Sequence, residues 1–311
     1  ETGDNLLYCK TPGGEWHSFY FGSIAPTYST FGDIVVDDIG QKWIIGHRGV
    51  GLIVFNDGGT LSNTGDDQMK KLTQSLGNGN LASNDINSIA KDLDGEIWVG
   101  TTNGISVFYS PESVFEGGDF DSQQILVEQD GYVQQLLENE TVTDIVIDGA
   151  NQKWIGTASA GVFLMSDDGT DEIHHFTTEN SPLFSDAIVS IGVDHLTGEV
   201  FIGTDKGLMS YRGSATYGGN STEDYEVVAF PNPVEPNYDG PIAIRGLVTD
   251  SDIKISDVTG NVVYTTTAEG GTAVWNGRNP GGTRAKSGVY LVFASNKDGK
   301  EALVTKILLV N

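Results

Sequence analysis

Few side chains in this sequence are placed to carry out covalent or metal chemistry. Cys9 is the single cysteine, which excludes an intramolecular disulfide and a thiolate zinc site, and we interpret it as a buried or edge-strand thiol. The five histidines lack HExxH and HxxH spacings, and no GxSxG motif occurs. His174 and His175 are neighbours in an expected strand, so they face opposite sides of it and cannot chelate one ion together. We therefore predict no catalytic residue, no bound metal and no enzyme activity.

Acidic side chains are common and lie mostly in expected turns. Asp92-Leu-Asp94-Gly-Glu96 is similar to a calcium loop, but it lacks the 12-residue frame and the terminal Glu of an EF-hand. Asp-Gly is a strong hairpin signal, so we interpret the segment as a turn and predict no cofactor, with a structural calcium ion as the alternative. We interpret the acidic pairs as solvated turns; they are Asp37-Asp38, Asp66-Asp67 and Asp167-Asp168.

The composition excludes several classes of protein. The chain has 311 residues with 17 Lys and Arg against 43 Asp and Glu, a net charge of −26, so a nucleic-acid partner is not expected. No apolar run approaches the roughly 20 residues of a membrane-spanning helix. Hydrophobic residues make up 38% of the chain, which is enough for a core. The 41 glycines, about twice the usual share, indicate many tight turns between short strands.

Four internal repeats, beginning at Ile34, Ile86, Val142 and Ile188, are the strongest signal. In each repeat an apolar strand ends in Asp, a polar turn follows, a second strand carries an aromatic residue and closes on Gly, and a third strand begins at Gly. Antiparallel strands repeating about every 50 residues are typical of β-propeller blades. We expect the aromatic residue to wedge between neighbouring blades and the glycine to let backbones approach closely. These blade positions are Trp43, Gly46, Trp98, Gly100, Trp154, Gly156, Phe201 and Gly203.

The fold class that follows is all-β, in two domains. Residues 1–212 are predicted to form propeller blades, 213–224 a linker rich in Gly, Ser, Thr and Asn, and 225–311 an immunoglobulin-like sandwich of about seven short strands. The charge changes across this boundary: residues 1–224 carry 9 basic and 34 acidic side chains, whereas residues 225–311 carry 8 and 9.

The repeats between residues 30 and 211 resemble the two-component-regulator propeller repeat, although the first has an extra residue before Gly46 and the fourth has Phe201 in place of Trp. The resemblance implies a ring of about seven blades, of which this chain would supply the last part. Leu6–Tyr8 and Trp16–Phe21 would then be the third and fourth strands of a preceding blade. The alternative is a four-bladed ring in which Trp16–Phe21 completes the last blade.

The C-terminal segment resembles the type A sorting domain of the type IX secretion system. The resemblance rests on Phe230-Pro231-Asn232-Pro233, Ile253–Tyr264, Ser287-Gly288-Val289-Tyr290 and Val304–Leu308. We expect Pro231 and Pro233 to hold an extended edge piece, and Gly288 to permit close approach before Val289 and Tyr290 enter a core strand. Alternation places Lys306 on the face opposite Thr305 and Ile307. The strand Leu303–Val310 would offer unpaired backbone groups to a translocon.

Both resemblances together imply a non-enzymatic exported protein of the type IX machinery in a Bacteroidetes-type bacterium. Its location would be the outer-membrane surface or the extracellular space. Its partners would be the translocon and the outer-membrane attachment-complex proteins, with lipopolysaccharide used to anchor cargo. The alternative is a ligand- or glycan-binding surface propeller that the same system exports as cargo. An enzyme using the propeller face is a third reading, since propellers also host enzymes.

Overall fold

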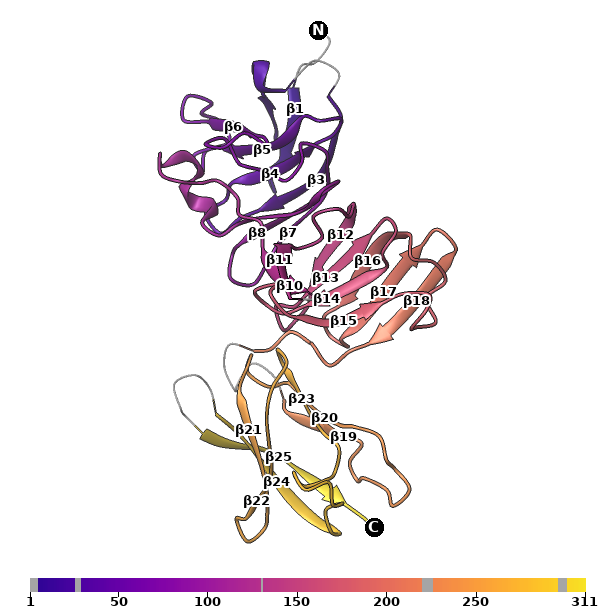
Figure 1. Ribbon diagram of the computed structural model, residues 1–311. Coiled ribbons are helices and arrows are strands. Elements are labelled where there is room, and N and C mark those ends of the chain that lie inside the picture. The colour runs from indigo at the N-terminus through magenta and orange to yellow at the C-terminus, as the bar shows by residue number, and fades with distance from the viewer. Residues whose placement is uncertain (1–4, 26–28, 130, 220–225, 296–300) are drawn as a thin grey trace. The chain divides into compact units, whose positions relative to one another are not determined.

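The computed structural model describes residues 5–25, 29–129, 131–219, 226–295 and 301–311 (Figure 1). Within these ranges the only helical segments are two short 3₁₀ turns, η1 (Gly22–Ile24) and η2 (Pro111–Phe115), so the all-β prediction is confirmed. No helix in the described ranges is long and apolar enough to cross a membrane.

The chain forms two compact units. The predicted linker stays a prediction, because residues 220–224 of it lie outside the described ranges. The first unit contains Glu1–Ile147, Lys153–Ile191 and Ile202–Met209, and the second contains Asp148–Gln152, Gly192–Phe201 and Ser210–Asn311.

The four repeats form four antiparallel sheets in which neighbours in sequence are neighbours in space (Figure 1). Polar turns and left-handed glycines let each strand fold back on the one before it. The first and third sheets have four strands, and the second and fourth have three. Their strands are β3 (Phe31–Val36), β4 (Lys42–Gly46), β5 (Gly51–Asn56) and β6 (Gln68–Leu72); β7 (Ile86–Lys91), β8 (Ile97–Thr101) and β9 (Gly104–Phe108); β12 (Val142–Ile147), β13 (Lys153–Thr157), β14 (Val162–Met165) and β15 (Glu172–Phe176); and β16 (Ile188–Asp194), β17 (Glu199–Thr204) and β18 (Gly207–Arg212).

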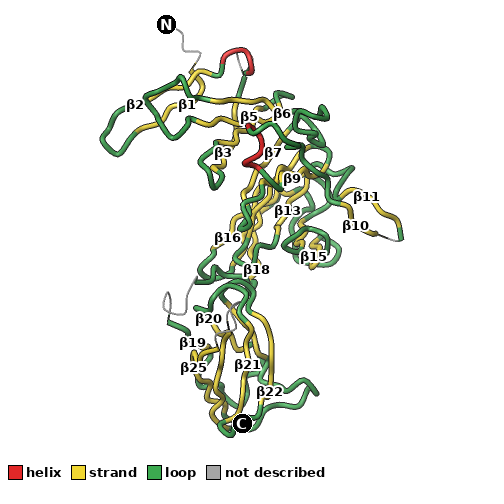
Figure 2. Tube along the Cα trace, turned by 90° about the vertical axis from the view of Figure 1, so that its left-hand side faces the viewer, coloured by secondary structure: helices red, strands yellow, loops and turns green. Residues whose placement is uncertain are grey.

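The second sheet has a separate hairpin at the place where the first and third sheets have a fourth strand. A bridge between Val107 and Gln123 extends the sheet by one contact. The chain then forms the separate hairpin β10 (Leu126–Gln129) and β11 (Tyr132–Gln135), which Figure 2 shows as a two-stranded projection.

The N-terminal strands β1 (Asn5–Lys10) and β2 (Trp16–Tyr20) pair only with each other among the described strands. They contribute Phe19 to a core shared with Ile53 and Phe55 of β5, and their assignment to a preceding blade stays a prediction. Because β2 pairs with β1 and not with β18, the four-bladed ring closed by Trp16–Phe21 is wrong.

Seven strands form two further antiparallel sheets around one core, and we call them the C-terminal sheets. Trp275, Ile255, Val292 and Ile307 are fully buried between them. The strand number agrees with the sequence, while the immunoglobulin-like class stays a prediction. One sheet contains β19 (Val228–Phe230), β20 (Ile242–Arg245) and β23 (Thr272–Trp275); the other has the order β22 (Val262–Thr267), β21 (Asp252–Asp257), β24 (Gly288–Ser295) and β25 (Glu301–Leu309).

Candidate functional site

The aspartate that ends the first strand of a repeat organises the turn after it. Asp92 Oδ1 accepts the backbone N–H groups of Asp94 (3.0 Å) and Glu96 (2.9 Å), and Oδ2 accepts the indole N–H of Trp98 (3.2 Å). The Asp37 carboxylate likewise accepts the indole N–H of Trp43 at 2.9 Å. The Asp92 oxygens therefore hold the turn and the indole, and the geometry gives the calcium alternative no support. Asp37 is buried, so the interpretation as a solvated turn is wrong for Asp37, whereas Asp38 is exposed.

A buried lysine links the second repeat to the third. Lys153 Nζ lies 3.0 Å from Asp92 Oδ2, and both side chains are fully buried. The ammonium also lies 4.8 Å from the centre of the Trp98 ring and donates to the backbone carbonyl of Asp167. The Asp92 carboxylate, the face of the Trp98 ring and the Asp167 carbonyl thus replace the water molecules that the ammonium group loses on burial.

Sequence reasoning missed Lys153, although one signal was available. Gln-Lys-Trp occurs twice, at Gln41-Lys42-Trp43 and Gln152-Lys153-Trp154. The first lysine behaves differently, because Lys42 pairs at 2.8 Å with Asp57, which follows β5 of the same repeat.

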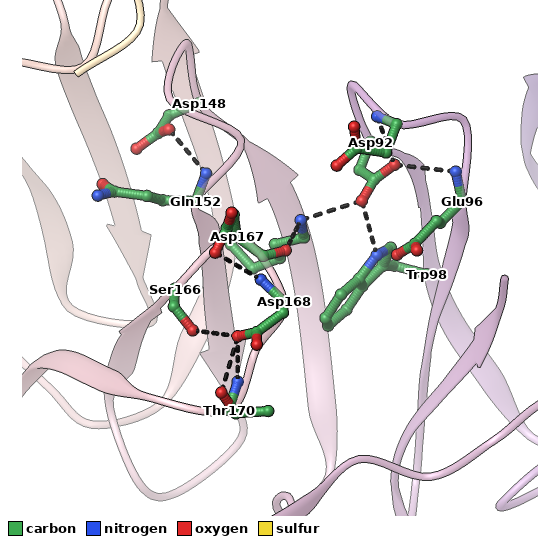
Figure 3. A network of polar contacts seen from close by, with 11 residues as sticks. Asp92, Glu96, Trp98, Asp148, Gln152, Ser166, Asp167, Asp168 and Thr170 are labelled. Atoms are coloured by element: carbon green, nitrogen blue, oxygen red, sulfur yellow. Dashed lines mark hydrogen bonds and ion pairs between the residues drawn. The ribbon is translucent and has the colours of Figure 1, made fainter. Parts of the chain in front are cut away.

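Two acidic groups in this region depart in opposite directions from their ordinary pKa. Burial, with a further contribution from the charge of Asp92, raises the pKa of Glu96 to about 7. Hydrogen bonds from Ser166 (2.7 Å) and Thr170 lower the pKa of Asp168 (Figure 3).

The aromatic blade positions differ in burial. Trp43, Trp98 and Trp154 are buried, and the Trp43 ring lies 5.0 Å from the ring of Phe108 in the next sheet. Phe201 is 41% exposed, so the expectation that it wedges between blades is wrong for the described residues. In the described part of the chain, β16, β17 and β18 form the full width of the fourth sheet.

At each of the four blade glycines, the atom nearest to an added Cβ belongs to a side chain. A Cβ on Gly100 would lie 2.6 Å from Val142 Cγ1, and one on Gly156 would lie 2.7 Å from Ile188 Cγ2. Val142 and Ile188 begin the first strand of the following repeat. The expected close approach of backbones is therefore corrected to an insertion of the next repeat's first apolar side chain. Gly46 and Gly203 instead face Val50 and Ser190 of their own repeats.

The Pro-Asn-Pro segment lies along the outer edge of β25. The Asn232 side chain donates to the carbonyl of Lys306 and accepts the N–H of Leu308, both at 2.9 Å. Val234 continues this pairing with the carbonyl of Leu308 and the N–H of Val310. The expectation that this strand offers a free edge is therefore wrong over Lys306–Val310. Pro231 and Pro233 flank the asparagine, and both are preceded by cis peptide bonds.

The other predicted sorting residues divide between core and surface. A Cβ on Gly288 would meet nothing within 4 Å, so the expected close approach is wrong. Val289 is 37% exposed, which corrects its placement in the core. Tyr290 is buried; its hydroxyl donates to the carbonyl of Lys286 at 2.8 Å. Lys306 is exposed beside the fully buried Ile307, as the alternation predicts.

Comparisons with known proteins support the propeller repeats of this chain. Residues 80–103 match the two component regulator propeller family. No curated protein sequence matches the chain.

Among solved structures, the chain is similar to PorZ of Porphyromonas gingivalis, described as an essential bacterial surface component of the type IX secretion system. The identity is 29% with a TM-score of 0.61, over 98% of this chain and 42% of PorZ. This chain thus spans less than half the length of PorZ.

Two more distant structures show lower similarity. The extracellular domain of BT4673 from B. thetaiotaomicron, described as part of a one component system, is 14% identical with a TM-score of 0.46, over 100% of this chain and 43% of that chain. A gluconolactonase from Xanthomonas campestris is 13% identical with a TM-score of 0.41, over 68% of this chain and 66% of its own.

Proposed function

We propose that this chain is a non-enzymatic, exported surface component of a type IX secretion system, comparable to part of PorZ. The observation that supports the proposal most strongly is the match to PorZ over 98% of the chain at 29% identity, which includes the repeats and the C-terminal sheets.

The polar network of the repeats supports a non-enzymatic role. Its central pair, Asp92 and Lys153, has no exposed side-chain surface, so it cannot touch a substrate. Among the described residues, no group of three or more His, Cys, Asp or Glu side chains is placed to hold a metal ion. The exposed surface of the repeats has a shape and a negative charge that are suited to binding a partner.

We further propose that the translocon reads the outward face of β24 and β25 and not the edge of β25. The edge is paired with Asn232 and Val234, whereas Val289 and Leu308 face each other in register and are 37% and 41% exposed. Lys306 is exposed on the same face. An apolar surface with one cation is a suitable docking face for a protein partner.

A role with lipopolysaccharide belongs to the proposal, and the charge indicates where contact would occur. The repeats would repel an anionic polysaccharide, since residues 1–224 carry 34 acidic and only 9 basic side chains. Lys254 and Lys306 are exposed on one face of the C-terminal sheets. We expect the full chain to bind immobilised host lipopolysaccharide and the Lys254→Glu/Lys306→Glu variant to lose binding. Equal binding by both proteins would contradict this placement.

Surface display in the native host tests the main proposal. Deleting Leu303–Asn311 would remove Ile307 and Leu309 from the core, so unfolding would obscure the result. The exposed-face variant Lys306→Glu/Leu308→Ser avoids this, and Val228→Ser on the other sheet is the matched control. We expect the first variant to accumulate in the periplasm and the control to reach the surface. Normal display of both proteins would contradict the proposal.

The fate of the C-terminal sheets separates the proposal from its alternative. Mass spectrometry of the native surface protein is expected to find residues 225–311 retained. Their removal would instead identify an exported cargo protein that binds a ligand or glycan.

A further inference from the structure

A cavity of about 590 Å³ lies in the first unit, between the hairpin β10–β11, the following loop and the third sheet. Its floor is apolar: Phe163 and Met165 of β14 are buried. The ring of His175 stacks on Phe163, with centroids 3.8 Å apart, and its Nε2 donates to the carbonyl of Ala160 at 2.7 Å. The volume lies within the range of small-molecule binding sites, about 300–1,000 Å³.

The rim of this cavity carries acidic side chains and, within the described residues, no basic side chains that would balance their charge. No Lys or Arg lines it, and none of its carboxylates forms an ion pair within the described part of the chain. Glu140 accepts a hydrogen bond from Ser159 at 3.1 Å. Carboxylates that surround one hollow repel each other, and a bound cation relieves that repulsion. The acidic lining residues are Glu128, Glu138, Glu140, Asp171 and Glu172.

The chemistry of the lining favours an organic cation over a metal ion. No three of these acidic groups are placed to hold a metal within the described residues. The buried side chains of Phe163 and Met165 cannot coordinate a bare metal ion through oxygen or nitrogen. They can pack against the aliphatic stem of a lysine or arginine side chain. The amides of Gln135 and Asn139 also line the cavity and can hydrogen-bond to a peptide backbone.

The hairpin beside the cavity extends the surface beyond the size of a small molecule. Val133 of β11 and Leu126 of β10 are 70% and 60% exposed on one face of the hairpin, and Tyr132 is 76% exposed on the other face. Exposed apolar and aromatic side chains next to a charged hollow are typical of protein–protein contacts.

We propose that this cavity and the hairpin β10–β11 bind an extended, basic segment of a protein partner. Lysine or arginine side chains of the segment enter the acidic cavity, and apolar side chains that alternate with them pack on the hairpin. This inference rests on the proposed function, because it names the chemistry of a partner in the surface assembly.

A labelled peptide in which arginine alternates with leucine tests the proposal by fluorescence anisotropy with the full chain. Its control replaces each arginine by the uncharged isostere citrulline. We expect the arginine peptide to bind at least about tenfold more tightly, and to weaken as NaCl rises from about 0.05 to about 0.3 M. Equal binding of both peptides would overturn the proposal.

Two charge-matched variants locate the site. Glu138→Gln/Glu172→Gln removes two rim carboxylates, and Glu179→Gln/Asp205→Asn removes two exposed carboxylates that do not line the cavity. We expect the rim variant to bind the arginine peptide at least about tenfold more weakly and the control variant to stay within about twofold. An equal loss in both variants would show that only the general negative charge attracts the peptide, and would overturn the proposal.

Failure of this inference is distinguishable from failure of the proposed function. If the peptide does not bind while the protein still reaches the cell surface by way of its C-terminal sheets, only the cavity proposal is wrong. If the peptide binds as expected but the exposed-face variant of β25 is displayed normally, the secretion proposal is wrong and the binding site stands.

Discussion

At the scale of single residues, we expect the removal of the Lys153 side chain to lower the free energy of unfolding strongly. Lys153→Met would leave the buried Asp92 carboxylate without its counter-charge. Breaking one partner of a buried pair costs about 3–5 kcal/mol. Urea unfolding should show this loss, and Asp92→Asn/Lys153→Met should recover part of it. Lys42→Met is the control, because its ion pair is partly exposed. A loss below about 1 kcal/mol for Lys153→Met would contradict the burial of the pair.

The raised pKa of Glu96 leads us to expect that the stability of the protein depends on pH. Its pKa rises from 4.5 to about 7 on folding, so the folded protein binds more protons than the unfolded chain between these values. The contribution of Glu96 to the free energy of unfolding is therefore complete below about pH 4.5 and is lost as the pH rises through about 7. Glu96→Gln should raise the melting temperature relative to the parent protein at pH 8 and change it little at pH 4.

Asp257 provides a control of opposite sign for that measurement. Hydrogen bonds from Thr259 and Asn261 lower its pKa to about 2, so its contribution is present above about pH 3.8 and is lost as the pH falls through about 2. Asp257→Asn should lower the melting temperature at neutral pH. A Glu96→Gln variant with the same pH profile as Asp257→Asn would contradict the assignment.

At the scale of elements, burial decides which tryptophan holds neighbouring repeats together. Trp98 is fully buried, while Trp16 in β2 is 64% exposed. Trp98→Ala should lower the free energy of unfolding by about 3–5 kcal/mol as a large-to-small core substitution. Trp16→Ala should change it by less than about 0.5 kcal/mol. Similar values for the two variants in urea unfolding would show that the assigned register of the repeats is wrong.

The second prediction at this scale concerns the edge of β25, which is held by hydrogen bonds with the Asn232 side chain. Asn232→Ala removes two hydrogen bonds to this strand, each of which contributes about 0.5–1.5 kcal/mol. The amide of Leu308 should then exchange its hydrogen faster, whereas the amide of Ile307, which faces β24, should change less. Unchanged exchange at Leu308 would show that the side-chain pairing is not formed in solution.

At the scale of the whole molecule, charge is divided unequally along the chain. Residues 1–224 carry 9 basic and 34 acidic side chains, and residues 225–311 carry 8 and 9. Mutual repulsion destabilises a strongly acidic unit, and salt screens that repulsion. Calorimetry should therefore show the transition of the repeats moving to higher temperature as NaCl rises from about 0.02 to about 0.5 M, while that of the C-terminal sheets moves little. Equal shifts of both transitions would contradict this account.

Much of the fold could be predicted because its signals are local. The spacing of six residues between Asp92 and Trp98 is long enough for one turn, and the aspartate satisfies that turn's own N–H groups. The alternation around Ile307 likewise follows from the period of a strand. The seven C-terminal strands were found in the same way, by short apolar runs between turn residues.

The sequence by itself determined the all-β class and the four repeats, because these depend on neighbours along the chain. The repeated position of the tryptophan also predicted the burial of Trp43, Trp98 and Trp154. Only the tertiary structure decided the partner of Lys153, which lies 61 residues away, and the partners of Asn232, which lie 74 and 76 residues away. It also decided that Phe201 is exposed although its repeat resembles the others. The physical reason is that burial and pairing depend on which surface packs against a residue, and residues distant in sequence supply that surface.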